Sequence, residues 1–244
     1  MRPIDVAIEQ TLAFLRRVLP RPPLRVLDAG CGRGDLAARL TASGFEVTAL
    51  DSSPQAVRHA RALGVPAIHV DFLEYEAAPY DAVLFSRSLH HMHPLPGAVA
   101  RAFTLLKPGG RLVAEEFARE RADRQTAAWF YDVRALLRDA GVLEIAKERG
   151  RGTNPLDRWR ADHVEKHGHP LHTSGAMLAE IAHRLEVTDT EDAPYLYWYL
   201  TRWIEESPRG CAVSDRLLEI ETRRITTGLL APMGVRIIAR RRVA

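Results

Sequence analysis

The stretch Val26-Leu-Asp-Ala-Gly-Cys-Gly-Arg-Gly-Asp35 decides the fold class of this chain. Its first residues are typical of a short buried strand. An acid follows them, then glycines at alternate positions, then a residue that can begin a helix. This order predicts a nucleotide-type cofactor held at a strand-to-helix turn of a parallel α/β sheet.

Asp28 narrows the choice of cofactor. A dinucleotide places its pyrophosphate at the N-terminus of the helix, where backbone N–H groups and the helix dipole favour an anion, and a carboxylate beside it would repel that anion. The dinucleotide fingerprint also requires a third glycine at position 35, which is Asp35. S-adenosylmethionine (SAM) has no phosphate and carries an ammonium and a sulfonium, so the acid favours SAM.

The pattern Asp28-x-Gly30-x-Gly32-x-Gly34 resembles the first motif of class I SAM-dependent methyltransferases. Three glycines alone could also form a turn that binds no ligand, so the resemblance depends on companion motifs in the right order. It implies that the turn holds the cofactor through Asp28, Gly30, Cys31, Gly32 and Gly34. Cys31 would serve as a small residue and not as a nucleophile.

Two acids at predicted strand ends extend the resemblance. Asp51 ends an apolar strand about 20 residues beyond the glycines, where an acid can accept hydrogen bonds from both ribose hydroxyls. We expect Ser52, which follows it, to take part in the same contact, although Asp51 could instead only cap the next helix. The resemblance implies that Asp71 faces the adenine amino group and Phe72 the ring, although a plain loop acid would look the same.

The stretch from Tyr80 to Pro94 resembles the family's fourth strand and the loop that contacts the methionine part of SAM. It implies contacts from Ser86 and Arg87. The stretch Leu105-Leu-Lys-Pro-Gly-Gly-Arg-Leu-Val-Ala114 resembles the helix end and turn that lead into the fifth strand. Together the matches span residues 24–117.

The alternation of short apolar runs with amphipathic segments predicts a Rossmann-like α/β fold. We expect a seven-stranded, mostly parallel sheet whose last strand is antiparallel, with helices on both faces. The expected strands are 24–29, 45–50, 66–70, 80–85, 110–117, 185–189 and 235–240. The expected helices are 4–19, 34–43, 54–63, 96–106, much of 122–147, 174–184 and 213–227, with a polar loop at about 148–172.

Two long insertions depart from the minimal fold. We expect residues 1–244 to form a single methyltransferase domain, with cap insertions at about 118–173 and 191–233. Both insertions leave the predicted sheet at the carboxyl ends of strands, which is the edge that binds the cofactor. They therefore predict an enclosed pocket for a small methyl acceptor. The aromatic run 195–199 could line this pocket, although ordinary core packing is the more common role of each such residue.

Histidines and glutamates at strand ends are candidates for a general base, which an acceptor needs only if it must lose a proton. We expect His91 to be the base and Glu116 to orient the acceptor. The neighbouring candidates are His90, His93 and Glu115. The same loop could instead only pack against the cofactor. A second group of histidines has spacings that suit metal ligands, and it contains His163, His167, His169 and His172. It lacks cysteines and falls in the predicted polar loop, so no metal is expected.

Composition and net charge limit the location and the partners that we expect for the protein. A 46% apolar content in 244 residues suffices for a packed core, and no apolar run approaches the ~20 residues of a membrane span. Cys31 and Cys211 lie far apart and the N-terminus lacks a signal-peptide pattern, so we expect a cytoplasmic protein without a disulfide. A net charge of +3 without a basic stripe gives no reason to expect nucleic acid or membrane as partner. A monomer and a homodimer are both open.

The sequence therefore predicts an enzyme that transfers a methyl group from SAM to O, N or C of a small organic molecule, leaving S-adenosylhomocysteine. An RNA or protein methyltransferase is the alternative within the fold. It is disfavoured because Phe85-Ser-Arg-Ser stands where an Asn/Asp-Pro-Pro-Tyr signature would bind a planar amino group. A nicotinamide oxidoreductase is disfavoured by Asp28 and Asp35, and a non-catalytic SAM-binding protein stays open.

Overall fold

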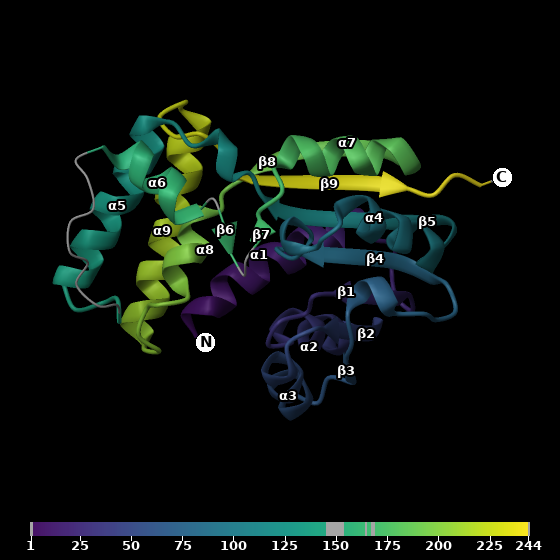
Figure 1. The fold of residues 1–244 in the computed structure, drawn as a ribbon. Coiled ribbons are helices and arrows are strands. Elements are labelled where there is room, and N and C mark those ends of the chain that lie inside the picture. Colours follow the sequence, from purple (N-terminus) through teal and green to yellow (C-terminus); the bar gives the residue numbers. More distant parts are fainter. Residues whose placement is uncertain (1, 145–153, 164, 167–168, 244) are drawn as a thin grey trace. The chain divides into compact units, whose positions relative to one another are not determined.

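The computed structural model describes residues 2–144, 154–163, 165–166 and 169–243 of the chain. The chain divides into two compact units (Figure 1). We call residues 10–117, 172–191 and 235–244 the sheet unit, and residues 1–9, 118–171 and 192–234 the helical unit. Among the described residues, no helix combines the length and apolar character needed to cross a bilayer.

A seven-stranded sheet runs in the order β3-β2-β1-β4-β5-β9-β8, and Figure 1 shows the strands side by side in this order. The strands β1 to β5 pair in parallel. Hydrogen bonds from Gly109 N to Arg241 O and from Arg241 N to Gly110 O show that β9 is antiparallel to β5. The strands are β1 (Arg25–Ala29), β2 (Glu46–Asp51), β3 (Ala67–His69), β4 (Tyr80–Ser86), β5 (Leu106–Phe117), β8 (Glu186–Ala193) and β9 (Gly234–Arg240). The predicted fold class is thereby confirmed.

Both faces of the central parallel strands β1 and β4 are buried, as their near-continuous apolar sequences predict. Val83 and Phe85 of β4 belong to the same core cluster as Met177 and Ile181 of α7, while Leu84 between them is buried on the other face. The helices that lie wholly or partly within this unit are α1 (Pro3–Val18), α2 (Asp35–Ala42), α3 (Pro54–Ala62), α4 (Leu95–Leu105) and α7 (Ser174–Arg184), with short 3-10 turns η1 (Phe72–Glu74) and η2 (Leu89–His91).

Local signals set the ends of these elements. Ser53 accepts a hydrogen bond from Ala56 N and Pro54 opens α3, so the helix begins directly after β2. The outermost strand β8 carries several carboxylates, which protect an exposed sheet edge from pairing with another chain. Because β1 and β4 lie next to each other and both end at the carboxyl edge, the turns that follow them are neighbours.

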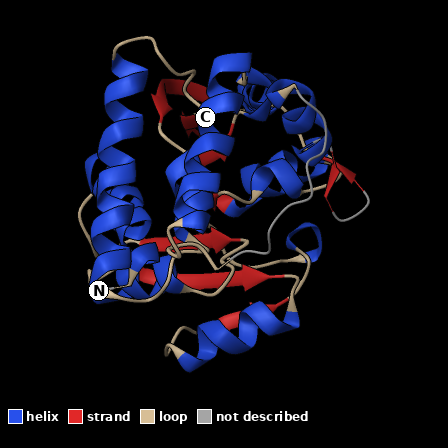
Figure 2. Cartoon of the chain, turned by 90° about the vertical axis from the view of Figure 1, so that its left-hand side faces the viewer, coloured by secondary structure: helices blue, strands red, loops and turns tan. Residues whose placement is uncertain are grey.

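The helical unit consists mainly of helices, with one short hairpin (Figure 2). Its elements are η3 (Arg119–Arg121), α5 (Arg124–Asp139), α6 (Pro155–His163), β6 (Glu165–Lys166), β7 (His169–Pro170), α8 (Leu196–Thr201) and α9 (Pro208–Thr226). The assignment of 1–244 to a single domain with insertions at 118–173 and 191–233 stays a prediction.

The predicted polar loop at 148–172 is wrong where the structure describes it, because it contains α6 and the β6–β7 hairpin. The helix expected over 122–147 ends at Asp139, before Gly141 with its φ of 69°, and residues 145–147 lie outside the described residues. The helix expected from 213 begins earlier, at Pro208, because Ser207 accepts a hydrogen bond from Gly210 N and Pro208 opens the first turn.

Candidate functional site

The glycine turn between β1 and α2 uses three glycines in the left-handed region. The φ angles of Gly30, Gly32 and Gly34 are 79°, 56° and 82°. A Cβ on Gly30 would lie 2.6 Å from the Cβ of Ser88, and one on Gly34 would lie 2.6 Å from the Cβ of Ala60, so these two glycines permit close packing. A Cβ on Gly32 would meet no atom within 4 Å, so the middle of the turn is open to a ligand.

Asp51 ties this turn to the end of β2. One carboxylate oxygen of Asp51 accepts a hydrogen bond from Gly32 N at 2.8 Å, and the other accepts one from Ser53 N at 2.8 Å. Gly30 N and Cys31 N donate to the carbonyl of Leu50 next to it. Each oxygen keeps acceptor capacity for one further donor, such as a ribose hydroxyl. The predicted ribose contact is therefore chemically open to Asp51.

Asp28 lies beneath the turn, at 1% exposure. Neither carboxylate oxygen has a hydrogen-bond partner among the described residues. Burial raises the pKa of Asp28 to about 7, and the nearby Asp51 acts in the same direction, while Arg87 opposes the shift. An isolated buried carboxylate is costly, and a cation would relieve that cost. The site thus fits a cofactor that carries positive charge and no phosphate.

Cys31 is not arranged as a nucleophile. Burial raises the pKa of its thiol far above the usual range, and the negative charges of Asp28 and Asp51 raise it further. The thiol therefore stays protonated near neutral pH. This agrees with a small residue that only fills the turn.

The residues predicted to surround the adenosine follow β2 and β3. Asp71 is exposed, and its carboxylate accepts a hydrogen bond from Leu73 N at 2.9 Å. Phe72 is 5% exposed and packs edge-to-face on Phe85, with ring centroids 5.3 Å apart. Ser52 is exposed next to Asp51. Their cofactor contacts stay predictions.

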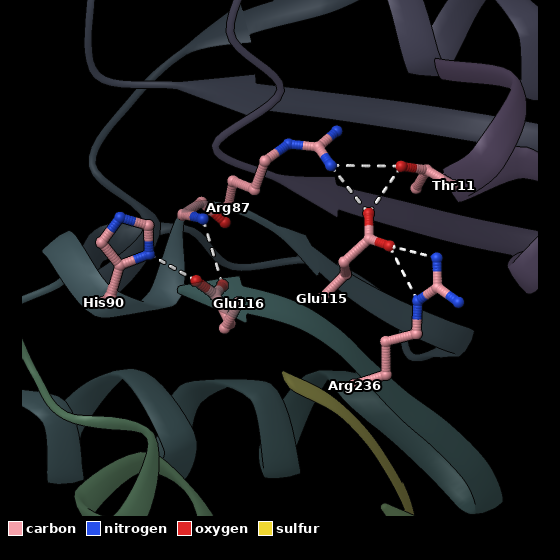
Figure 3. Close-up of polar contacts among 7 residues, drawn as sticks. Thr11, Arg87, His90, Glu115, Glu116 and Arg236 are labelled. Carbon is pink, nitrogen blue, oxygen red and sulfur yellow. Dashed lines mark hydrogen bonds and ion pairs between the residues drawn. The ribbon is translucent and has the colours of Figure 1, made fainter. Parts of the chain in front are cut away.

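Ser86 is the last residue of β4, and Arg87 follows it. The Ser86 hydroxyl oxygen is buried and has no hydrogen-bond partner among the described residues. Arg87 has a φ of 62°, which is rare for a residue with a side chain. Its guanidinium lies 2.7 Å from a carboxylate oxygen of Glu115 and donates to the hydroxyl of Thr11 at 3.2 Å (Figure 3).

Glu115 is the centre of a buried ionic network (Figure 3). Thr11 donates to one of its oxygens at 2.5 Å, and Arg236 of β9 donates to the other at 2.8 Å. Burial alone would raise the pKa of Glu115, but Arg87 and Arg236 outweigh it and lower the pKa below its usual value. Glu115 therefore holds together the ends of several elements and is not a candidate base.

Glu116, the next residue of β5, reaches the loop after β4 instead (Figure 3). It is fully buried, and one oxygen accepts hydrogen bonds from Ser88 N at 3.1 Å and Leu89 N at 2.7 Å. The other oxygen lies 2.5 Å from Nδ1 of His90. Glu116, chosen from the sequence to orient an acceptor, thus bonds to the loop after β4, including His90.

His91, the base chosen from the sequence, is exposed, and its ring centroid lies 4.1 Å from that of the buried His90. On the other side of the loop, the rings of His93 and His172 are 4.0 Å apart. Burial lowers the pKa of His172; the bond from its ring to the carbonyl of Met92 opposes this shift, and His93 and His90 add to it. Sequence reasoning named this loop but missed the bond between His90 and Glu116.

Three of the four histidines of the second group are among the described residues. His163 stacks on Trp159 with ring centroids 3.8 Å apart, His169 is exposed, and His172 belongs to the sheet unit. His167 lies outside the described residues. Within the described ranges, no group of three or more His, Cys, Asp or Glu side chains could hold a metal ion.

The sequence and the fold both have known relatives. A family model described as a methyltransferase domain matches residues 5–187. The chain is 36% identical over 121 residues to a ubiquinone biosynthesis O-methyltransferase of Xylella fastidiosa (strain 9a5c), covering 46% of this chain and 49% of that protein. It is 33% identical over 178 residues to the enzyme of the same name from Methylocella silvestris, covering 60% of this chain and 70% of that protein.

The chain therefore spans about half the length of the first of these relatives. Among solved structures, a S-adenosylmethionine dependent methyltransferase from Mesorhizobium loti shares the fold, with a TM-score of 0.62 and 21% identity. The match covers 98% of this chain and all of the other. At that identity the likeness concerns the fold alone.

Proposed function

We propose that this chain, which belongs to the class I SAM-dependent methyltransferase family, transfers the methyl group of SAM to a hydroxyl oxygen of a small organic molecule. Family membership confirms the prediction made from the glycine turn, and SAM is the cofactor of that family. Transfer to oxygen is supported by the relatives, which are named as O-methyltransferases.

One observation carries the proposal: the buried Asp28 carboxylate has no hydrogen-bond partner among the described residues, and it lies beneath a glycine turn that is open at Gly32. A pyrophosphate there would add negative charge beside Asp28 and Asp51, whereas the ammonium and sulfonium of SAM would neutralise it. The geometry therefore favours a cationic nucleoside and disfavours a dinucleotide.

The residues that would hold SAM come from the ends of four neighbouring strands, β3, β2, β1 and β4. We assign Asp28 and the glycine turn to the methionine side, together with the buried hydroxyl of Ser86. We assign Asp51 and Ser52 to the ribose, and Asp71 and Phe72 to the adenine. The guanidinium of Arg87 is committed to Glu115, so we propose that Arg87 contributes through its left-handed backbone and its charge near Asp28.

When bound, SAM supplies an electrophilic methyl group on a sulfonium sulfur. The protein must hold the acceptor oxygen in line with that group and exclude water. A neutral hydroxyl is a weak nucleophile, so a base assists its transfer. Imidazole is a weak base, which suits a phenol with a pKa near ~10 better than an aliphatic alcohol. We therefore propose a phenolic acceptor.

Several sequence predictions stay open at this level. The roles of His91 as base and of Glu116 as acceptor-orienting group stay predictions, although the bond between Glu116 and His90 favours a different assignment. The same holds for the enclosing role of the insertions, for a monomer or homodimer, for a cytoplasmic location and for the expected lack of a nucleic-acid partner.

Calorimetry on the purified chain tests the proposal. SAM and S-adenosylhomocysteine should bind with micromolar affinity, and NAD should not bind. Transfer of tritium from methyl-labelled SAM to 3,4-dihydroxybenzoate then tests for methylation of a phenol. Binding of NAD without SAM would overturn the cofactor assignment. Binding of SAM without any transfer would favour the alternative of a SAM-binding protein.

A further inference from the structure

We propose that His90 is the base that takes the proton of the acceptor hydroxyl, and that Glu116 is the positioning residue that fixes its imidazole. This inference rests on the proposed transfer to oxygen. In the step, the O–H bond breaks and its proton goes to Nε2 of His90, while the oxygen gains the methyl carbon. The bond from that carbon to sulfur breaks with its electron pair left on sulfur.

The hydrogen bond to Glu116 selects the tautomer of His90. A carboxylate offers only acceptors, so Nδ1 of His90, 2.5 Å from Glu116, must carry the hydrogen. Nε2 then holds the free electron pair that can accept a proton. Glu116 is itself fixed, because it is fully buried and accepts two backbone hydrogen bonds from Ser88 and Leu89. The imidazole is thus oriented before any acceptor arrives.

The turn that carries His90 packs directly on the cofactor turn. The hydroxyl of Ser88 donates to the carbonyl of Ala29 at 2.6 Å, at the point where β1 ends. Gly30 approaches Ser88 so closely that a Cβ would lie 2.6 Å from its side chain. Because His90 follows Ser88 by two residues, this contact places the turn that carries His90 beside the site proposed for the methionine end of SAM.

His90 and the next residue, His91, differ in burial. His90 is 2% exposed, whereas His91 is exposed. The titratable groups near His90 are Glu116 from β5, His91 from its own turn and His172. The backbone N–H of His172 donates to the backbone carbonyl of His90 at 3.0 Å. Glu116 stabilises the imidazolium that forms when His90 takes the proton. A positive charge on His172 or His91 would oppose that imidazolium, and burial, which lowers the pKa of His172, favours the neutral form of His172.

The test compares His90→Gln, Glu116→Gln and His91→Gln in the full chain, with His183→Gln as a matched control on the exposed end of α7. Methylation of 3,4-dihydroxybenzoate gives kcat and KM, calorimetry gives the SAM Kd, and urea unfolding reports stability. We expect His90→Gln to lower kcat about 100-fold or more, and Glu116→Gln about 10–100-fold, with the SAM Kd within about threefold of the parent.

The pH profile separates a base from a structural residue. In His90→Gln the remaining activity should rise about tenfold per pH unit up to the phenol's own pKa near ~10, because only the phenolate formed in solution reacts. The parent should reach its plateau well below that pH. A fall in kcat with an unchanged profile would overturn the base assignment, as would full activity in His90→Gln with loss in His91→Gln.

Nitrogen NMR of histidine-labelled protein with S-adenosylhomocysteine tests the tautomer without any acceptor. We expect the His90 signal of an Nδ1–H ring in the parent and a mixture of tautomers in Glu116→Gln. An Nε2–H ring in the parent would overturn the inference. If Glu116→Gln does not fold, the parent's tautomer and His90→Gln carry the test. A parent that binds SAM but methylates no phenol overturns the proposed hydroxyl chemistry and this inference with it, whereas normal parent turnover with an active His90→Gln overturns this inference alone.

Discussion

Replacing Asp28 by Asn should stabilise the cofactor-free protein at alkaline pH and weaken its binding of SAM. Burial raises the pKa of Asp28 from 3.8 to about 7, a difference of roughly 3 units. At 1.36 kcal/mol per unit, keeping this carboxylate ionised in the folded state costs about 4 kcal/mol at most. The Asn amide carries no charge but leaves buried polar atoms, which costs about 1–3 kcal/mol. We therefore expect a net gain of about 1–3 kcal/mol at pH 8.5.

The sign of the pH dependence follows from the raised pKa. Asp28 binds its proton more tightly in the folded state than in the unfolded chain, so its stabilising contribution is present below pH 3.8 and is lost as the pH rises through about 7. In Asp28→Asn this part of the pH dependence disappears. The difference in unfolding free energy between variant and parent should therefore grow from near zero at pH 5 to its full value at pH 8.5.

Urea unfolding at pH 5, 6, 7 and 8.5 measures this difference. Glu221, whose pKa burial also raises to about 7, contributes a similar trend to both proteins and cancels in the comparison. The exposed Asp215→Asn serves as a control that removes one carboxylate from the surface. Parallel stability curves for Asp28→Asn and the parent would refute the account of an unpaired buried charge.

The pH dependence of SAM binding tests the ionisation of Asp28 a second time. A bound cation favours the ionised form of Asp28, so the parent's affinity for SAM should fall about tenfold per pH unit below 7, and binding near pH 6.5 should release protons. Calorimetry in buffers of different ionisation enthalpy counts those protons. Asp28→Asn should bind SAM more weakly and with little pH dependence. An equal proton release in both proteins would assign it to another group.

The remaining predictions concern the turn and the helical unit. Asp51→Ala should weaken SAM binding by ~1–3 kcal/mol through lost ribose hydrogen bonds, and an unchanged Kd in calorimetry would contradict the assignment. Gly32→Val should abolish SAM binding, because the φ of 56° at this position strains a branched residue and the valine side chain would fill the open space. Gly34→Ala should instead lower the unfolding midpoint, because the added Cβ would lie 2.6 Å from the Cβ of Ala60. Glu221→Ala should lower the unfolding free energy by about 3 kcal/mol or more, because three buried N–H groups at the start of α8 lose their acceptor; urea unfolding followed by tryptophan fluorescence checks this.

The sheet unit could be predicted because its signals are local. Strands buried on both faces have continuous apolar sequences, and the turns between them end in glycine or proline. The cofactor turn was readable for the same reason: Gly30, Gly32 and Gly34 adopt a backbone that other residues avoid. The strand and helix bounds of this unit accordingly agree with the expected ranges within a few residues.

Helix α6 could not be predicted because distant contacts stabilise it. Only Trp159 and His163 are buried in it, so its sequence lacks the periodic apolar face that indicates a helix. The Trp159 indole donates to the carbonyl of Arg119, forty residues earlier, and its ring packs on Phe130 with centroids 5.3 Å apart. Neither partner is visible from the sequence around α6.

The partners of the adjacent residues Glu115 and Glu116 could not be predicted from the sequence. Successive residues of a strand point to opposite faces of the sheet, so the two carboxylates lie on opposite faces. Their partners lie far off in the chain: Arg236 follows Glu115 by 121 residues, and His90 precedes Glu116 by 26. A slip of β5 by one residue would exchange the faces, leaving Arg236 without its carboxylate and His90 without its orienting bond. Because uncompensated buried charge costs several kcal/mol, this pair specifies the register of β5, and the same register brings the carboxylate to His90 and not to His91.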